Sequence, residues 1–144
     1  MRPDDFHLKA IATGDVDLLL CFNDYNLIRQ TAADELLPAA AAADIGVMNG
    51  WSILCGLLTG INIDEAREKG RYKNDRDVDG SRKIWQWCQQ EEVNLLQLAI
   101  QFCLAETRIH GNPVGSLNTE QLEANVWAAS TPLDESVWTK FRAL

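Results

Sequence analysis

The segment Ile109–Val126 (IHGNPVGSLNTEQLEANV) holds the residues whose types and spacing best fit the binding of a phosphate. A β-branched strand pattern leads through Gly115 and Ser116 into a helix, for which Asn118 and Gln121 form the predicted cap pair. The first N–H groups of a helix lack partners within it and the helix dipole adds positive charge there, so an anion can bind without a basic side chain. Many helices begin in this way with no ligand, so the pattern needs support from the rest of the chain.

A second candidate is the run Asp75-x-Asp77-x-Asp79-Gly80, which resembles the first half of a calcium loop. The rest of that pattern is missing, because Gln86 stands at position twelve and Arg82 replaces the usual apolar residue. We therefore favour a solvated turn in which Asp79 or Ser81 caps the next helix, and we predict no metal site.

Composition and charge restrict the class of protein. The 144 residues are 47% hydrophobic and 24% charged, which predicts one globular domain with a buried core. The net charge is -8, and residues 111–139 contain neither Lys nor Arg, which argues against nucleic acid and anionic membranes as partners. No charged and apolar leader begins the sequence and no apolar run has the length of a membrane span, so we expect a cytoplasmic protein.

The four cysteines are widely spaced, lie in or beside apolar runs and form no C-x-x-C pair. They are expected to be buried, unbridged thiols in a reducing compartment: Cys21, Cys55, Cys88 and Cys103.

Hydrophobic patterning predicts alternating helices and short, solidly apolar strands, which is typical of an α/β fold with a parallel sheet. The charged segment 61–80 is expected to be a functional loop or to hold a short helix around Asp64–Lys69. Pro38 is expected to bend one helix by removing an internal hydrogen bond. The predicted strands are Val16–Phe22, Ile45–Asn49 and Ile109–Val114. The predicted helices include Asp5–Thr13, Thr31–Ala43, Ser81–Glu92, Leu95–Glu106 and Asn118–Ser130, and an amphipathic tail follows the last of them. Asn94 is expected to cap the helix Leu95–Glu106, with Gln97 completing a capping box.

Three segments in this order are similar to the last part of an aldo-keto reductase: FNDYNL, IGVMNGWSILCGLLTG and NPVGSLNTEQLEANV. The resemblance spans nearly the whole chain and is to the sugar-dehydrogenase branch, which includes L-galactose, L-fucose and D-threo-aldose dehydrogenases. It implies a (β/α)8 TIM barrel of about 250 residues, of which residues 1–144 would form one C-terminal domain with about three parallel strands and flanking helices. Residues 61–80 would then be the loop over the barrel mouth.

The resemblance also implies a site for a nicotinamide dinucleotide. Phe22 matches a position beside the nicotinamide at the end of the sixth barrel strand. The loop along the nicotinamide and pyrophosphate is matched by Asn49, Gly50, Trp51, Ser52 and Ile53, and the loop and helix around the adenosine phosphate and adenine are matched by Gly115, Ser116, Asn118, Gln121 and Asn125.

Members of the family transfer hydride between a nicotinamide cofactor and a carbonyl or sugar hydroxyl, with a catalytic Tyr, Lys, Asp and His. No residue of this sequence matches that set, since His7, His110, Tyr25 and Tyr72 lie in other contexts, so we predict no catalytic residue. Relatives that bind NADP usually carry Lys or Arg at the positions of Gly115 and Gln121. The cofactor is therefore expected to be NAD or NADP, with NAD favoured.

Three functional hypotheses remain open. The favoured one is a C-terminal, cofactor-binding part of an aldo-keto reductase without activity of its own. The second is a split barrel in which another polypeptide supplies the missing strands and the catalytic Tyr. The third is a non-catalytic interaction module whose open sheet edge pairs with another chain.

Overall fold

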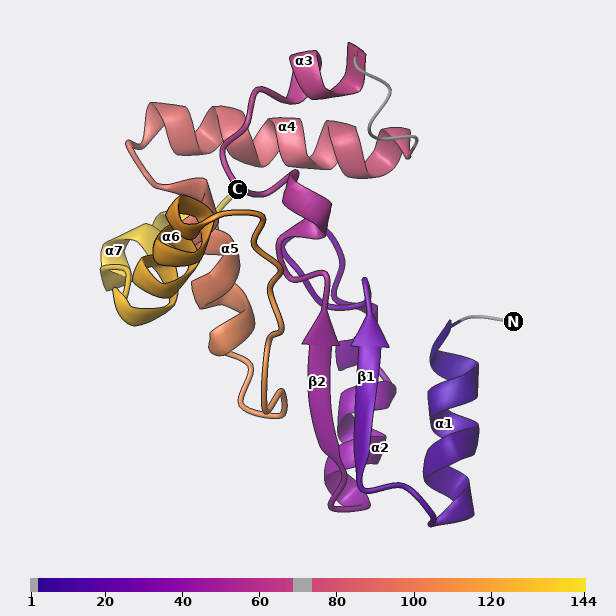
Figure 1. Ribbon diagram of the computed structural model, residues 1–144. Helices are drawn as coiled ribbons and strands as arrows, with labels where there is room; N and C mark the ends of the chain where they lie inside the picture. Colours follow the sequence, from indigo (N-terminus) through magenta and orange to yellow (C-terminus); the bar gives the residue numbers. More distant parts are fainter. Residues whose placement is uncertain (1–2, 69–73) are drawn as a thin grey trace. The chain divides into compact units, whose positions relative to one another are not determined.

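The computed structural model describes residues 3–68 and 74–144, which pack as two compact units. The first unit comprises the residues up to Leu54 together with 102–115, and the second comprises 55–101 and 116–144. The expectation of a single domain therefore stays a prediction. The elements are α1 (Pro3–Thr13), β1 (Leu18–Phe22), the 3-10 turn η1 (Thr31–Ala33), α2 (Leu36–Ala42), β2 (Gly46–Gly50), the 3-10 turn η2 (Leu54–Gly56), α3 (Ile63–Glu68), α4 (Asp75–Gln90), α5 (Leu95–Leu104), α6 (Thr119–Ser130) and α7 (Glu135–Phe141) (Figure 1).

The first unit is built on a parallel pair of strands, β1 and β2, with Leu19 paired to Val47 and Phe22 to Gly50 (Figure 1). Its core joins one face of these strands to α2 and includes Leu19, Cys21, Leu36, Leu37, Ala40 and Val47. The other face of β1 is exposed, so the expectation of a strand buried on both faces was wrong. Side chains of a strand alternate between two faces, and the helices of this unit cover only one of them.

The third predicted strand, Ile109–Val114, is an extended segment that pairs with β2 through one parallel bridge, Met48 to Gly111. His110 N donates to Val47 O and Asn49 N donates to Gly111 O, both at 2.8 Å. The pairing is short because Pro113 has no N–H to donate. A Cβ at Gly111 would lie 2.6 Å from the Met48 sulfur, so a larger residue at the bridge would displace the end of the Met48 side chain.

The alanine-rich segment Thr31–Ala43 is divided into η1 and α2 instead of forming one bent helix. α2 begins at Leu36, so Pro38 lies in its first turn, where a backbone N–H has no partner within the helix. The predicted loss of an internal hydrogen bond was therefore wrong. A proline is tolerated in the first turn of a helix, because its fixed φ is close to the helical value and the N–H that it lacks would have no partner there.

In the second unit, α5 contacts the C-terminal part of the chain through hydrogen bonds, and α4 contacts it through an aromatic side chain. Asn94 caps α5 as predicted, accepting from Gln97 N at 2.9 Å. The Gln97 amide does not complete a capping box and instead donates to Thr131 O at 2.8 Å. Phe141 of α7 makes edge contacts with Trp87 and Trp138, so the predicted amphipathic tail is confirmed.

The short helix expected in the charged segment is confirmed as α3, although Lys69 lies outside the described residues, as does Tyr72. α4 begins at Asp75, six residues earlier than predicted, because Asn74 caps it by accepting from Arg76 N and Asp77 N. Neither Asp79 nor Ser81 is the cap, and that expectation was wrong.

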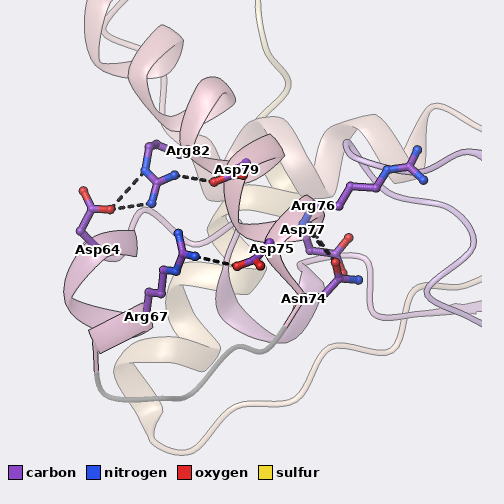
Figure 2. Close-up of polar contacts among 8 residues, drawn as sticks. All are labelled: Asp64, Arg67, Asn74, Asp75, Arg76, Asp77, Asp79 and Arg82. Atoms are coloured by element: carbon purple, nitrogen blue, oxygen red, sulfur yellow. Dashed lines mark hydrogen bonds and ion pairs between the residues drawn. The ribbon is translucent and has the colours of Figure 1, made fainter.

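The acidic run that resembles a calcium loop is helical. Figure 2 shows two of its three carboxylates directed to separate arginines, with Asp75 paired to Arg67 at 2.7 Å and Asp79 paired to Arg82 at 2.7 Å. Arg82 also binds Asp64 of α3 at 2.6 Å. Acidic residues in the first turn of a helix are stabilised by its dipole, which explains why this run forms a helix and not a loop.

Asn74→Ala is expected to destabilise the protein by about 1 kcal/mol, because two N–H groups at the start of α4 lose their acceptor. Ser81→Ala is the matched control. The Ser81 hydroxyl is buried with no hydrogen-bond partner in the described part of the chain, so its removal should leave stability unchanged or slightly higher. Urea denaturation of both variants measures the difference, and a larger loss for Ser81→Ala would restore it as the cap.

None of the four cysteines forms a disulfide in the described structure. Cys21, Cys88 and Cys103 are buried as predicted, whereas Cys55 is exposed. Burial raises the pKa of the Cys88 and Cys103 thiols to about 12. Among the described residues no helix is both long enough and apolar enough to cross a membrane.

Candidate functional site

The carboxyl ends of β1 and β2 are marked by backbone strain. Asn23 directly follows β1 with φ 62°, Trp51 directly follows β2 with φ 68°, and Leu54 has φ 50°. Residues with a side chain rarely adopt this left-handed conformation, and it persists where the surrounding structure imposes it. This end of the sheet is therefore the first place to look for a functional site.

Asn49 is the hydrogen-bonding centre of this end of the sheet. Its side chain is completely buried. The amide Nδ2 donates to Tyr25 O and to Asn112 Oδ1, both at 2.9 Å, and Oδ1 accepts from the Cys21 thiol at 3.5 Å. The side chain thus connects β1 and the segment that follows it with the extended segment at 112. A contribution of Asn49 to cofactor binding would therefore act through the position of these segments.

Two aromatic side chains lie together at the same end. The rings of Phe22 and Trp51 have their centroids 4.5 Å apart and their planes tilted by 48°. Phe22 is 52% exposed and Trp51 is 39% exposed, so both rings present area to the surroundings. Such a pair can bind a flat ring by stacking or edge contacts.

The residues between them complete a compact turn. A Cβ at Gly50 would lie 3.0 Å from Cys21 O, a tight contact that would push the two strands slightly apart at this point. Ser52 is buried, and its Oγ has no hydrogen-bond partner within the described residues. Ile53 is half-buried. A buried hydroxyl without a partner is unusual and is consistent with a polar ligand atom at this turn.

In the second unit, the start of α6 is held by reciprocal hydrogen bonds. Asn118 Oδ1 accepts from Gln121 N at 2.9 Å, and Gln121 Oε1 accepts from Leu117 N at 2.8 Å, which confirms the predicted cap pair. Asn125 Nδ2 donates to Ser116 Oγ at 3.0 Å, so the loop is also tied to the second turn of the helix. The structure therefore brings together four of the five residues predicted for the adenosine phosphate.

The fifth, Gly115, is exposed, and a Cβ there would meet no atom within 4 Å. The loop has no strict need for glycine at this position. Glu120 is an acidic residue in the first turn of α6, and the nearest basic residue in the sequence is Arg108 on one side and Lys140 on the other. Between Arg108 and Lys140, the chain therefore offers a phosphate at this helix only backbone N–H groups and uncharged side chains.

Packing and hydrogen bonds within the fold account for the side chains of Tyr25 and the two histidines. The Tyr25 ring is buried and stacks on Phe102 with centroids 5.4 Å apart, and its pKa is raised by burial and then by Glu106. Arg108 holds Glu106 by two hydrogen bonds of 2.7 Å and lowers the pKa of that carboxyl. His110 Nδ1 accepts from Val47 N at 3.1 Å and so takes the place of a strand carbonyl. His7 Nε2 donates to Leu20 O at 3.0 Å.

Sequence reasoning missed Asn112 as a partner of Asn49. The signal was weak: an amide residue directly before Pro113 in an otherwise apolar strand pattern. The strained residues Asn23 and Trp51 were also not predicted to be strained, because their conformation follows from the turn geometry and not from their residue types.

Comparison with known proteins was consistent with this architecture. The model of the Aldo/keto reductase family matches residues 7–144. The chain is 29% identical over 136 residues to D-threo-aldose 1-dehydrogenase of Pseudomonas sp, covering 92% of this chain and 40% of that protein. It is 28% identical over 127 residues to L-galactose dehydrogenase of Arabidopsis thaliana, covering 88% and 38% respectively.

Among solved structures, the holo form of aldo-keto reductase AKR11C1 from Bacillus halodurans matches with a TM-score of 0.69 and 19% identity, over 99% of this chain and 47% of that one. The apo form matches with the same TM-score over 48% of its length. The predicted α/β fold is confirmed as part of an aldo-keto reductase barrel, with two strands and a bridged extended segment where about three strands were expected. The chain spans less than half the length of these relatives, and it belongs to the aldo/keto reductase family.

Proposed function

We propose that this chain is the cofactor-binding part of an NAD(P)-dependent aldo-keto reductase that acts on sugars or other aldehyde and alcohol groups. The turn after β2 is the observation that carries the proposal. It combines the exposed Phe22 and Trp51 rings, the tight backbone approach at Gly50, and the buried Ser52 hydroxyl, which has no hydrogen-bond partner among the described residues. The substrate class follows the names of the two curated relatives, both of which are sugar dehydrogenases.

Each unit is proposed to contact one part of the dinucleotide. In the first unit, Phe22, Trp51 and Ser52 would contact the nicotinamide side. In the second, Ser116 and the first turn of α6 would contact the adenosine phosphate. When bound, the nicotinamide group would accept or donate hydride, and the residues of this chain would hold and orient it.

The proposal is tested one unit at a time with half-ligands. Nicotinamide mononucleotide is expected to shift the NMR amide signals of residues 50–53, and ADP those of residues 116–121, with millimolar affinity because each half-ligand makes few contacts. Absence of shifts in both segments at ~10 mM ligand, a concentration above this affinity range, would disprove the cofactor role.

The preference for NAD over NADP is proposed from Gly115 and Gln121 themselves, which are uncharged residues at positions where relatives that bind NADP usually carry Lys or Arg. Gln121→Arg should strengthen binding of 2',5'-ADP by about tenfold, because the arginine can form a charge-assisted hydrogen bond to the 2'-phosphate. Such a bond is worth roughly 1.5–3 kcal/mol, and solvent at this exposed position reduces that free energy. Binding of plain ADP should change little. NMR titration measures the ratio of the affinities for 2',5'-ADP and ADP. Glu123→Arg, at an exposed position on the same helix, is the control for added charge. Equal gains for the two ligands would contradict this assignment.

These 144 residues are proposed to be inactive alone, since none of them matches the catalytic Tyr, Lys, Asp and His. A completed barrel is the second candidate, favoured by the exposed apolar face of β1. A cytoplasmic location is proposed from the unbridged thiols, which persist in reducing compartments.

A further inference from the structure

Asn23, the residue that directly follows Phe22, is held by hydrogen bonds to three of its groups. Its backbone N donates to Gly50 O at 3.2 Å, and its side-chain Oδ1 accepts from Asn26 Nδ2 at 3.1 Å. Its carbonyl accepts from Nη1 of Arg29 at 3.0 Å. These bonds hold the left-handed φ of 62°, which a residue with a side chain rarely adopts.

The turn between residues 26 and 29 brings Arg29 back to this point of the chain. Asn26 and Arg29 form an antiparallel bridge, in which Asn26 N donates to Arg29 O at 2.6 Å. The Asn26 side chain is completely buried, and its Oδ1 accepts from Ile28 N at 2.9 Å and from Arg29 N at 3.1 Å. The turn is therefore fixed by its own hydrogen bonds, and it places the guanidinium beside the Asn23 carbonyl.

Of these three hydrogen bonds at Asn23, the bond from Arg29 is the one with a charged donor. Hydrogen bonds from a charged donor are roughly twice as strong as those between neutral groups. Arg29 is half-buried, so solvent competes with this bond less than it would at an exposed position. We therefore expect Arg29 to contribute most to keeping Asn23 in its left-handed conformation.

The conformation of Asn23 decides how two aromatic rings meet. Phe22 precedes Asn23 on β1, and Gly50, which accepts the hydrogen bond from Asn23 N, precedes Trp51 on β2. The ring centroids of Phe22 and Trp51 are 4.5 Å apart. If Asn23 relaxed to an ordinary backbone conformation, the end of β1 would turn and the Phe22 ring would move away from its place beside Trp51.

We propose that Arg29 is a positioning residue for the nicotinamide side of the dinucleotide. Through the Asn23 carbonyl, it keeps the Phe22 and Trp51 rings in the arrangement that accepts a flat ring. A site that is arranged before its ligand arrives binds more tightly, because less ordering is needed on binding. The inference rests on the proposed function for its ligand, and it adds a residue that lies outside the turn after β2.

The first measurement needs no ligand. The Trp51 indole should shift the NMR ring signals of Phe22, and Trp51→Ala gives the position of those signals without the indole. Arg29→Met removes the charged donor and should move the Phe22 signals at least halfway toward that position. Arg29→Lys should restore them, since a single carbonyl needs only one donor. The methyl signals of Leu19 and Val47 report whether the core of this unit is still folded.

The second measurement is the affinity for half-ligands, followed by NMR titration. Arg29→Met should bind nicotinamide mononucleotide about tenfold more weakly than the unaltered chain, the equivalent of one charge-assisted hydrogen bond. Nicotinamide riboside should lose the same factor, because displaced rings affect both ligands, whereas a direct contact of Arg29 with the phosphate would weaken the mononucleotide alone. Binding of ADP at residues 116–121, which belong to the other unit, should not change.

Gln30→Ala is the matched control, because Gln30 Nε2 donates to Asn26 O in the same turn, and it should leave the ring signals and the affinities unchanged. Asn23→Gly provides an independent test. Glycine adopts the left-handed conformation without strain, so Arg29→Met in this background should weaken mononucleotide binding by less than about twofold. If Arg29→Met alone loses the core signals, Arg29→Gln takes its place with the same expectations.

The positioning role would be overturned by unchanged Phe22 signals in the folded Arg29 variant, by no recovery in Arg29→Lys, or by a loss confined to the mononucleotide. An undiminished effect in the Asn23→Gly background, or an equal effect of Gln30→Ala, would also overturn it. If the unaltered chain binds neither nicotinamide half-ligand, the proposed function fails together with the ligand part of this inference. The ring signals still decide, without any ligand, whether Arg29 holds the aromatic pair.

Discussion

Asn49→Ala should lower the free energy of unfolding by about 3 kcal/mol, one of the two largest effects expected in this protein. The substitution removes the donor to Tyr25 O and to Asn112 Oδ1 and the acceptor of the Cys21 thiol, all in a buried environment. Each buried polar group left without a partner costs roughly 1–3 kcal/mol, and the deleted volume adds a cavity. Urea denaturation of the purified chain measures the loss.

Asn112→Ala is the matched control for this prediction. Asn112 is only half-buried, so water can replace it at Asn49 Nδ2 and the expected loss is about 1 kcal/mol. The double variant should lose less than the sum of the two single variants, because both remove the same hydrogen bond. If Asn49→Ala stays within about 0.5 kcal/mol of the unaltered chain, the typical size of a neutral surface change, Asn49 does not hold this site together.

Alkaline pH should weaken the fold through two buried thiols. The pKa of Cys88 and of Cys103 is about 12 in the folded chain against a reference value of 9.0. The unfolded chain therefore releases these protons first, so the full stability is present below about pH 9 and is lost as pH rises toward 12. One pKa unit corresponds to about 1.4 kcal/mol, so each thiol should account for about 2 kcal/mol at pH 10.5.

The measurement is urea denaturation at pH 8 and at pH 10.5. Cys103→Ala is expected to show about half of the alkaline loss, because one of the two buried thiols is gone. Cys55→Ser alters an exposed cysteine and should keep the full loss. Identical pH dependence in Cys103→Ala and the unaltered chain would show that the alkaline loss has another origin, such as tyrosine ionisation.

Much of the local structure could be predicted from short-range patterns. The apolar runs predicted as strands at 16–22 and 45–49 contain β1 (Leu18–Phe22) and most of β2 (Gly46–Gly50). Asn94 and Asn118 cap their helices as predicted, because an amide side chain before an apolar periodic run is a strong local signal. The family resemblance was also correct, since it depended on three segments in order and the family model covers residues 7–144. The cofactor residues remain predictions, although the predicted cap of α6 that would support a phosphate is present.

Other features could not be predicted, because they depend on contacts between distant segments. The predicted start of α4 was six residues late, since alternating aspartates suit a loop as well as a helix. Whether the segment forms a helix depends on the cap Asn74 and on the arginines that pair with the acidic side chains. The exposed face of β1 was missed, because a continuous apolar run indicates burial without saying which neighbours cover each face. The partner of Asn49 lies 63 residues away, and no local pattern connects it to Asn112.

The sequence by itself therefore determined the family and most of the helices and strands, because these depend on local residue type and spacing, and it supplies the residues proposed for a dinucleotide. Only the tertiary structure decided which of those residues are turned inward. Asn49 became the centre of a buried hydrogen-bond network, Phe22 and Trp51 formed an exposed pair, and Arg29 came to lie beside the Asn23 carbonyl. The physical reason is that burial and hydrogen-bond partnership belong to pairs of distant residues, which only the folded chain brings together.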